Sequence, residues 1–158
     1  MTAAGREFAV SVRQQLRPAP LRGRRIRELV RRALSRLAAA EADVRVLVVG
    51  DDDMARWNRE FLGRAGTTNV IAFSDEAPGE GGADRIAGDI LVSAPTCLAQ
   101  TRGWPGGADE RVFYFILHGM LHLAGHDHES GPAGARKMRR RETEIYRAVT
   151  RGPGAGRR

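Results

Sequence analysis

The order of hydrophobic and polar residues along the chain predicts strands alternating with helices. Residues Phe8–Val12 alternate with the period of a half-buried strand, and the nearly continuous apolar run Val44–Val49 is typical of an interior strand. Thr67–Phe73 and Ile86–Ser93 also have the composition of strands. The acidic, glycine-rich connection between these last two is short for a parallel crossover, so we expect them to pair as antiparallel neighbours.

Apolar residues that recur every three or four positions predict the helices. In Arg22–Ala40 they leave arginines on the opposite face. A second helix is predicted from Asp51, where three aspartates supply the N-cap and first turn, to Gly63, where glycine ends it. A short helix is predicted after Pro95, and a last amphipathic helix covers Pro132–Thr150.

A further helix, carrying the histidines of the chain, is expected at the centre of the fold. It is apolar on nearly every side, which is typical of a helix surrounded by other elements, and Asp109 is its expected N-cap. Together the elements predict a single α+β domain over residues 1–150, with a mixed sheet of about four strands and surrounding helices. Residues 151–158, basic and rich in glycine, are predicted to be a disordered tail.

Length and composition narrow the class of protein. The chain has 158 residues, enough for one domain with its own core, and no apolar run long enough to span a bilayer. Cys97 is the only cysteine, which excludes an internal disulfide and is typical of a reducing compartment. We therefore expect a cytoplasmic protein without a membrane partner.

The net charge of +7 is concentrated at the two ends of the chain. Residues 1–40 hold ten arginines against two glutamates, and residues 130–158 hold nine basic residues against two glutamates. Residues 51–90, by contrast, hold nine carboxylates and four arginines. Basic ends favour a polyanionic partner such as nucleic acid. Because Lys137 is the one lysine, the composition of the source genome is an alternative explanation.

All four histidines lie within residues 118–128. His118 and His122 are separated by one helical turn, so they share one face and can bind one ion. Gly125 allows a sharp turn that can return His128 as a third ligand. Three imidazoles with an open fourth position form a known arrangement of catalytic zinc. A histidine-rich helix end with ordinary packing roles is the alternative.

The same histidine spacing occurs in the metzincin metalloproteases, which have a glutamate directly after the first histidine as general base. Gly119 occupies that position here. Zinc lowers the pKa of bound water towards ~7, so hydroxide can form without a dedicated base. With arginines to neutralise its charge, a phosphodiester is a better expected substrate than a peptide, and a metzincin-like protease is the weaker alternative.

Four segments of the sequence resemble the YbeY family of bacterial zinc-dependent endoribonucleases. His118–His128 matches the family signature His-Gly-x-Leu-His-Leu-x-Gly-(Tyr or His)-Asp-His. Asn58–Phe73 resembles a second family segment that ends in a strand. Gly88-Asp89-Ile90 and Glu142–Ile145 resemble two more, in the same order as in the family.

The resemblance implies a single-strand-specific endoribonuclease with one Zn²⁺ per chain, bound by His118, His122 and His128. It implies a role in maturation of the 3′ end of the small-subunit ribosomal RNA and in ribosome quality control. Single-stranded RNA, ribosomal RNA and the small ribosomal subunit are the implied partners, and no DNA is expected. A non-catalytic ribosome-assembly or RNA-binding factor with a structural zinc is the alternative.

One departure from the family affects the expected catalytic machinery. The arginine that the family places beside the metal cleft, suited to stabilise phosphate charge in the transition state, falls at Leu62. Arg59 and Arg64 are the candidate substitutes, and without either the nuclease activity would be weak or absent. His126 is expected at the rim of the site, with substrate contact or a fourth metal position as alternatives. Asp127 could orient a ligand imidazole or stabilise the turn.

Overall fold

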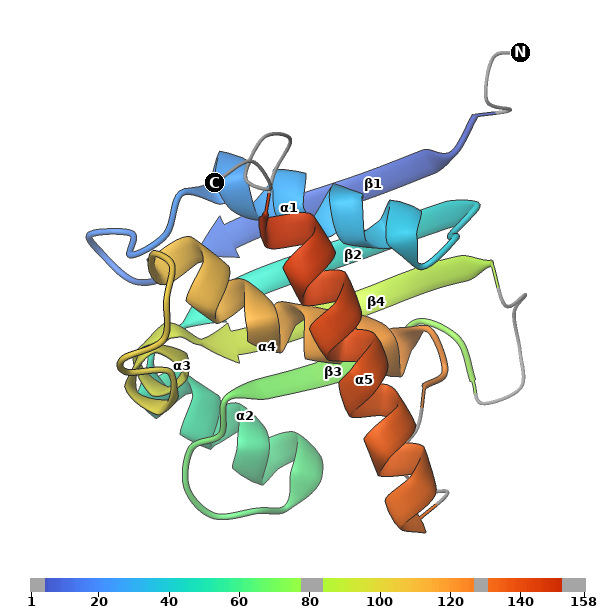
Figure 1. The fold of residues 1–158 in the computed structure, drawn as a ribbon. Coiled ribbons are helices and arrows are strands. Elements are labelled where there is room, and N and C mark those ends of the chain that lie inside the picture. Colours follow the sequence, from blue (N-terminus) through green and yellow to red (C-terminus); the bar gives the residue numbers. More distant parts are fainter. Residues whose placement is uncertain (1–4, 78–83, 127–130, 152–158) are drawn as a thin grey trace.

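The computed structural model describes residues 5–77, 84–126 and 131–151. Its centre is a mixed four-stranded sheet in the spatial order β1-β2-β4-β3 (Figure 1). The first three strands in this order run parallel, and β3 pairs antiparallel with β4, as the short connection between them predicts. The strands are β1 (Glu7–Gln14), β2 (Glu41–Val49), β3 (Val70–Ser74) and β4 (Arg85–Ser93).

The helices of the described residues lie on both faces of this sheet. Helices α1 and α4 cover one face side by side, and α5 crosses over them on the outside (Figure 1). Helix α2 packs against β4 and α3. The helices are α1 (Gly23–Arg36), α2 (Asp51–Leu62), α3 (Ala94–Gln100), α4 (Ala108–Leu123) and α5 (Gly131–Thr150). This arrangement confirms the predicted α+β fold.

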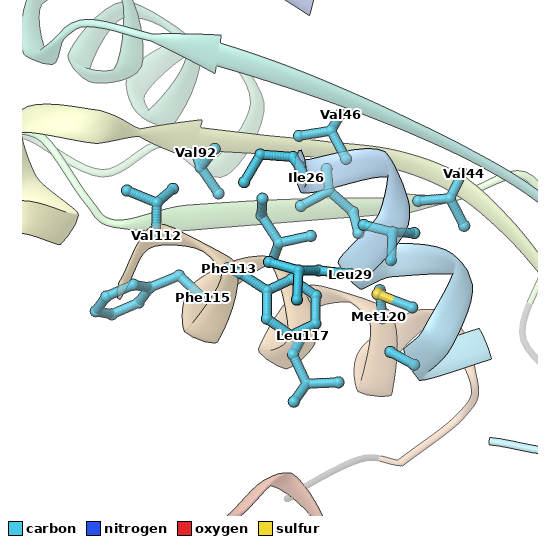
Figure 2. Close-up of a cluster of buried hydrophobic side chains, with 14 of the residues drawn as sticks. Ile26, Leu29, Val44, Val46, Val92, Val112, Phe113, Phe115, Leu117 and Met120 are labelled. Carbon is cyan, nitrogen blue, oxygen red and sulfur yellow. The ribbon is translucent and has the colours of Figure 1, made fainter. Parts of the chain in front are cut away.

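The main hydrophobic core lies between the sheet, α1 and α4 (Figure 2). Each fully buried aliphatic or aromatic side chain contributes about 1.5–3 kcal/mol relative to its exposed state. Helix α4 is apolar on nearly every side because the sheet, α1, α3 and α5 all pack against it, which confirms the predicted central helix. The core side chains labelled in Figure 2 include Ile26, Leu29, Val44, Val46, Val92, Phe113, Leu117 and Met120.

A smaller apolar cluster lies on the opposite face of the sheet, beneath α2. It joins Met54 of α2 to Val49, Ile71 and Leu91 of three strands. Alternate residues of a strand point to opposite faces, and these strand positions alternate with those that face the main core. Helices α2 and α4 therefore cover opposite faces of the sheet.

Two predicted N-caps are wrong. Gly107 caps α4, and Asp109 instead accepts hydrogen bonds from the backbone N–H (2.9 Å) and Nε–H (2.8 Å) of Arg22. Asp109 lies in the first turn of α4, where its carboxylate reaches the start of α1 and ties the two helices together. Gly50 caps α2, and Asp51 begins its first turn.

The sequence also predicts that no segment spans a membrane and that the last residues form a tail. Among the described helices, none combines the length and the apolar character needed to cross a bilayer. Of the predicted tail, Arg151 forms a turn directly after α5. Residues 152–158 lie outside the described part of the chain.

Candidate functional site

His118 and His122 lie side by side near the end of α4. Their Nε2 atoms are 3.2 Å apart, and their ring centroids are 4.8 Å apart. Two nitrogens bound to one tetrahedral zinc at 2.0–2.1 Å would be separated by about 3.3 Å. The pair therefore has the spacing of two ligands of a single ion, as their separation along the helix predicts.

Glu142 of α5 holds the ring of His118 from the other side. Its Oε2 lies 2.9 Å from Nδ1 of His118, and its side chain is only 3 % exposed. A carboxylate in this position accepts a hydrogen bond from Nδ1–H, and this tautomer has its lone pair on Nε2, which lies beside His122. Burial, followed by the adjacent Glu142 carboxylate, raises the pKa of Tyr114, so that its phenol stays neutral beside this pair.

The role of Glu142 was missed by the sequence analysis, which placed it only in a family segment of the last helix. The contact joins residues 24 positions apart and depends on how α5 crosses α4. Its neighbours in the sequence, Arg141 and Thr143, are polar, so the pattern predicts a surface residue. Only the resemblance of Glu142–Ile145 to the family marked this part of the helix.

Gly119 points away from this site and into the core. A Cβ atom at this position would lie 3.0 Å from Cγ2 of the buried Ile90 on β4. A side chain on the residue after the first histidine would therefore point at Ile90, which would have to shift, and not at the two histidines. Because the glutamate of a metzincin must face the metal, this geometry counts against a protease.

The chain turns sharply after α4, as expected. Gly125 adopts a left-handed conformation (φ 85°), and the N–H of His126 then donates to the carbonyl of Leu121 at 2.9 Å. The ring of His126 is half-buried, and burial, assisted by the positive charges of Arg141 and Lys137, lowers its pKa. Both effects disfavour the protonated form of His126.

The predicted third ligand, His128, lies outside the described residues, as does Asp127. Within residues 5–77, 84–126 and 131–151, no group of three or more His, Cys, Asp or Glu side chains comes together to hold a metal. The described half of the site thus consists of two imidazoles that could hold an ion and one carboxylate that orients the first of them, His118.

The candidate arginines share an exposed corner at the end of α2. Arg59 and Arg64 are both exposed, and so is Leu62 between them, where the family has its arginine. The left-handed Gly63 and a hydrogen bond from Nδ2 of Asn58 to the carbonyl of Gly66 (2.9 Å) fix the chain here. These residues belong to α2 and to the connection that follows it, and α2 and α4 cover opposite faces of the sheet.

Comparisons with known proteins identify the family of this chain. The endoribonuclease YbeY family matches residues 12–150. An endoribonuclease YbeY from Geobacter metallireducens is 37% identical over 147 residues, covering 90% of this chain and 96% of the relative. An endoribonuclease YbeY from Chloroflexus aurantiacus is 38% identical over 131 residues, covering 75% and 83%.

A solved structure shares the fold. The solution structure of TM1509 from Thermotoga maritima aligns with a TM-score of 0.60 at 20% identity, covering 90% of this chain and 88% of that one. The histidine-bearing central helix and the mixed sheet thus belong to a recurring architecture. The family match and the identities to its members confirm the resemblance seen in the four sequence segments. This chain belongs to the endoribonuclease YbeY family.

Proposed function

We propose that this chain cleaves single-stranded RNA with a Zn²⁺ ion bound by His118, His122 and His128. The enzyme class follows from membership of the endoribonuclease YbeY family. The observation that carries the proposal is the pair of Nε2 atoms, 3.2 Å apart, of His118 and His122. Gly125, in its left-handed turn, supports the return of the chain towards them.

A bound zinc ion would supply a Lewis acid and a hydroxide nucleophile at neutral pH. The residues of the chain prepare the site for it. Glu142 fixes the ring of His118 through Nδ1, so that Nε2 lies beside Nε2 of His122, where the metal would bind. Arg59 or Arg64 would neutralise phosphate charge in place of the arginine that falls at Leu62. His126, half-buried in the turn after α4, is proposed as a rim residue.

We infer that the RNA is ribosomal and that the site of action is the small ribosomal subunit in the cytoplasm. The basic outer surface of α5 supports an RNA partner, because RNA has one negative charge per phosphate. Helix α5 lines a surface groove in which arginines predominate over the one carboxylate, Glu144. These arginines are Arg136, Arg139, Arg140, Arg147 and Arg151.

The test measures bound zinc and RNA cleavage together. Purified wild-type protein should contain one equivalent of zinc and cut a single-stranded RNA, whereas His122→Ala should lose both properties. His126→Ala serves as the matched histidine variant and should retain its zinc. Normal zinc binding by both His118→Ala and His122→Ala would show that the ligand assignment is wrong.

A non-catalytic RNA-binding or ribosome-assembly factor with a structural zinc is the second candidate. The specific observation in its favour is Leu62, which stands where the family has its arginine, together with the position of α2 on the face of the sheet opposite α4. This candidate predicts one equivalent of zinc and RNA binding without cleavage. A preparation free of contaminating nucleases distinguishes the two directly.

A further inference from the structure

Three aromatic side chains form a cluster at the exposed end of α2, on the face of the sheet away from the histidines. The rings of Trp57 and Phe61, one helical turn apart, stack with centroids 4.9 Å apart and an interplanar angle of 14°. Phe61 also meets the ring of Phe73 on β3 edge-on, with centroids 5.4 Å apart. We call Trp57, Phe61 and Phe73 the α2 aromatic patch.

Packing of the fold accounts for Trp57 and Phe73 but not for Phe61. Trp57 and Phe73 pack against the apolar cluster beneath α2, whereas Phe61 is not part of it and remains 55 % exposed. Full burial of a phenylalanine side chain contributes about 1.5–3 kcal/mol, so the fold leaves much of that stabilisation unused. The next residue, Leu62, is 45 % exposed. Adjacent large apolar side chains left in water are typical of an interaction surface.

Two exposed arginines and one exposed carboxylate, Glu60, lie near Phe61 in the sequence. Arg59 and Arg64 are exposed, and among the described residues neither forms an ion pair with a carboxylate. The acidic start of α2 at Asp51 lies ten residues from Phe61, or about 15 Å along the helix axis. Aromatic rings beside unpaired arginines are the combination by which proteins bind single-stranded nucleic acid, since bases stack on the rings and phosphates approach the cations.

We propose that the α2 aromatic patch is a base-stacking subsite for single-stranded RNA. An unpaired base stacks on the exposed side of Phe61 and extends the Trp57–Phe61 stack, while the charge of Arg59 and Arg64 attracts the neighbouring phosphates. Bases inside a duplex already have both faces covered by their neighbours, so the subsite selects unpaired nucleotides. The inference rests on the proposed function, because it takes RNA as the substrate.

The position of the subsite also defines a path for the RNA across the molecule. Phe73 belongs to β3, the edge strand, which packs against α4 on its other face. An RNA held on the patch can therefore pass around the edge of the sheet to reach the histidines. An RNA bound on both sides of β3 is positioned without any contact to the hydrogen-bonding edges of its bases.

The fluorescence of Trp57 provides a direct test. The chain has two tryptophans, and Trp104→Phe leaves Trp57 as the only reporter. In a Trp104→Phe/His122→Ala background, which cannot cut the RNA, an oligouridylate should quench this fluorescence. Phe61→Leu keeps an apolar side chain but removes the ring, and should weaken binding about tenfold, as expected for the loss of one base–aromatic stack. Phe61→Tyr should restore wild-type affinity.

Two controls separate stacking from general binding. An oligomer with abasic sites keeps its phosphates and should bind about as weakly to wild-type Phe61 as the intact oligomer binds to Phe61→Leu. Trp104→Leu, on the connection before α4, removes the other large exposed aromatic side chain and should leave RNA affinity unchanged.

The inference is overturned if the protein cuts RNA but Phe61→Leu binds the oligouridylate as tightly as the protein with Phe61 does. It is also overturned if abasic and intact oligomers bind with equal affinity. A dimer that Phe61→Leu dissociates, with no change in RNA affinity, would assign the patch to self-association instead. If wild-type protein neither binds nor cuts RNA, the proposed function itself fails, and that result is distinct from the first two.

Discussion

Glu142 on α5 accepts a hydrogen bond from Nδ1 of His118 on α4, at 2.9 Å, and is itself almost completely buried. The contact occupies Nδ1 of His118, so Nε2 is the nitrogen that lies beside His122 and would bind a metal. A histidine ligand held in this way needs no reorientation when the ion binds, and the carboxylate makes the imidazole a stronger donor. The crossing of α5 over α4 is therefore part of the site and not only of the fold.

Loss of this carboxylate should weaken metal binding. Glu142→Gln keeps the size of the side chain but removes its charge, so its amide can present either a donor or an acceptor to Nδ1. We expect zinc affinity to fall about 10–100-fold, the usual effect of removing such a partner, when measured by competition with a chromogenic chelator.

The matched control for this change is Glu144→Gln on the same helix, where the side chain is 71% exposed and pairs loosely with Arg141 at 3.7 Å. It should bind zinc like the wild type. Unaltered affinity in Glu142→Gln would mean that the contact with His118 serves only the packing of α5.

Two kinds of variant test whether Arg59 or Arg64 replaces the family arginine: removal of each arginine, and its restoration at Leu62. If Arg59 or Arg64 stabilises the transition state, its change to alanine should slow cleavage about 10²-fold without releasing zinc, since one electrostatic contact to developing charge has this order of effect. Leu62→Arg restores the family residue and should accelerate cleavage. Initial rates on a single-stranded RNA, with zinc content measured in parallel, provide the comparison.

Arg56→Ala is the control for these variants, because Arg56 lies on the same helix but pairs with Asp53 at 3.2 Å. Its rate should match the wild type. If Arg59→Ala, Arg64→Ala and Arg56→Ala all cut RNA at the same rate, neither of the two candidates replaces the family arginine.

Gly88 on β4 is required by the close approach of β3. A Cβ atom at this position would lie 2.2 Å from the backbone oxygen of Phe73 and 2.7 Å from Cδ2 of Leu123. The first contact cannot be relieved by a change of rotamer, so Gly88→Ala must displace the edge strand or the end of α4. We expect a loss of about 3 kcal/mol in the free energy of unfolding.

Urea denaturation of Gly88→Ala against Gly5→Ala measures this cost, since a Cβ at Gly5 meets nothing within 4 Å. Because Leu123 directly follows His122, the variant should also bind zinc more weakly. A Gly88→Ala protein as stable as the wild type would show that β3 does not lie as close to β4 as described.

The fold was more predictable from the sequence than the surroundings of the site. Local patterns indicated α4 as a buried helix and β3 and β4 as antiparallel neighbours, since both follow from nearby residues. The partners of Asp109 and Glu142 were not predictable, because Arg22 and His118 reach them only through helix packing. An aspartate at a helix start is a good N-cap locally, and only the tertiary fold directs Asp109 to α1.

Asp51 links the start of α2 to the junction of β4 and α3. Its Oδ1 accepts hydrogen bonds from the hydroxyls of Ser93 (2.6 Å) and Thr96 (2.5 Å). These bonds, that of Ser93 first, hold the pKa of Asp51 below its ordinary value of 3.8. The Asp51 carboxyl therefore binds its proton less tightly in the folded protein than in the unfolded chain. The resulting stabilisation is complete above the unfolded pKa and is lost as pH falls through the folded pKa.

Asp51→Asn should therefore destabilise the protein near neutral pH by about 1 kcal/mol, a modest effect because the carboxylate is exposed to solvent. The difference from wild type should shrink below pH ~4, where the unfolded carboxyl is already protonated. Asp52→Asn, in the same turn, controls for the helix dipole, which acts on both aspartates. Urea unfolding between pH 3 and 7 checks this, and a pH-independent difference would assign the effect of Asp51 to something other than its charge.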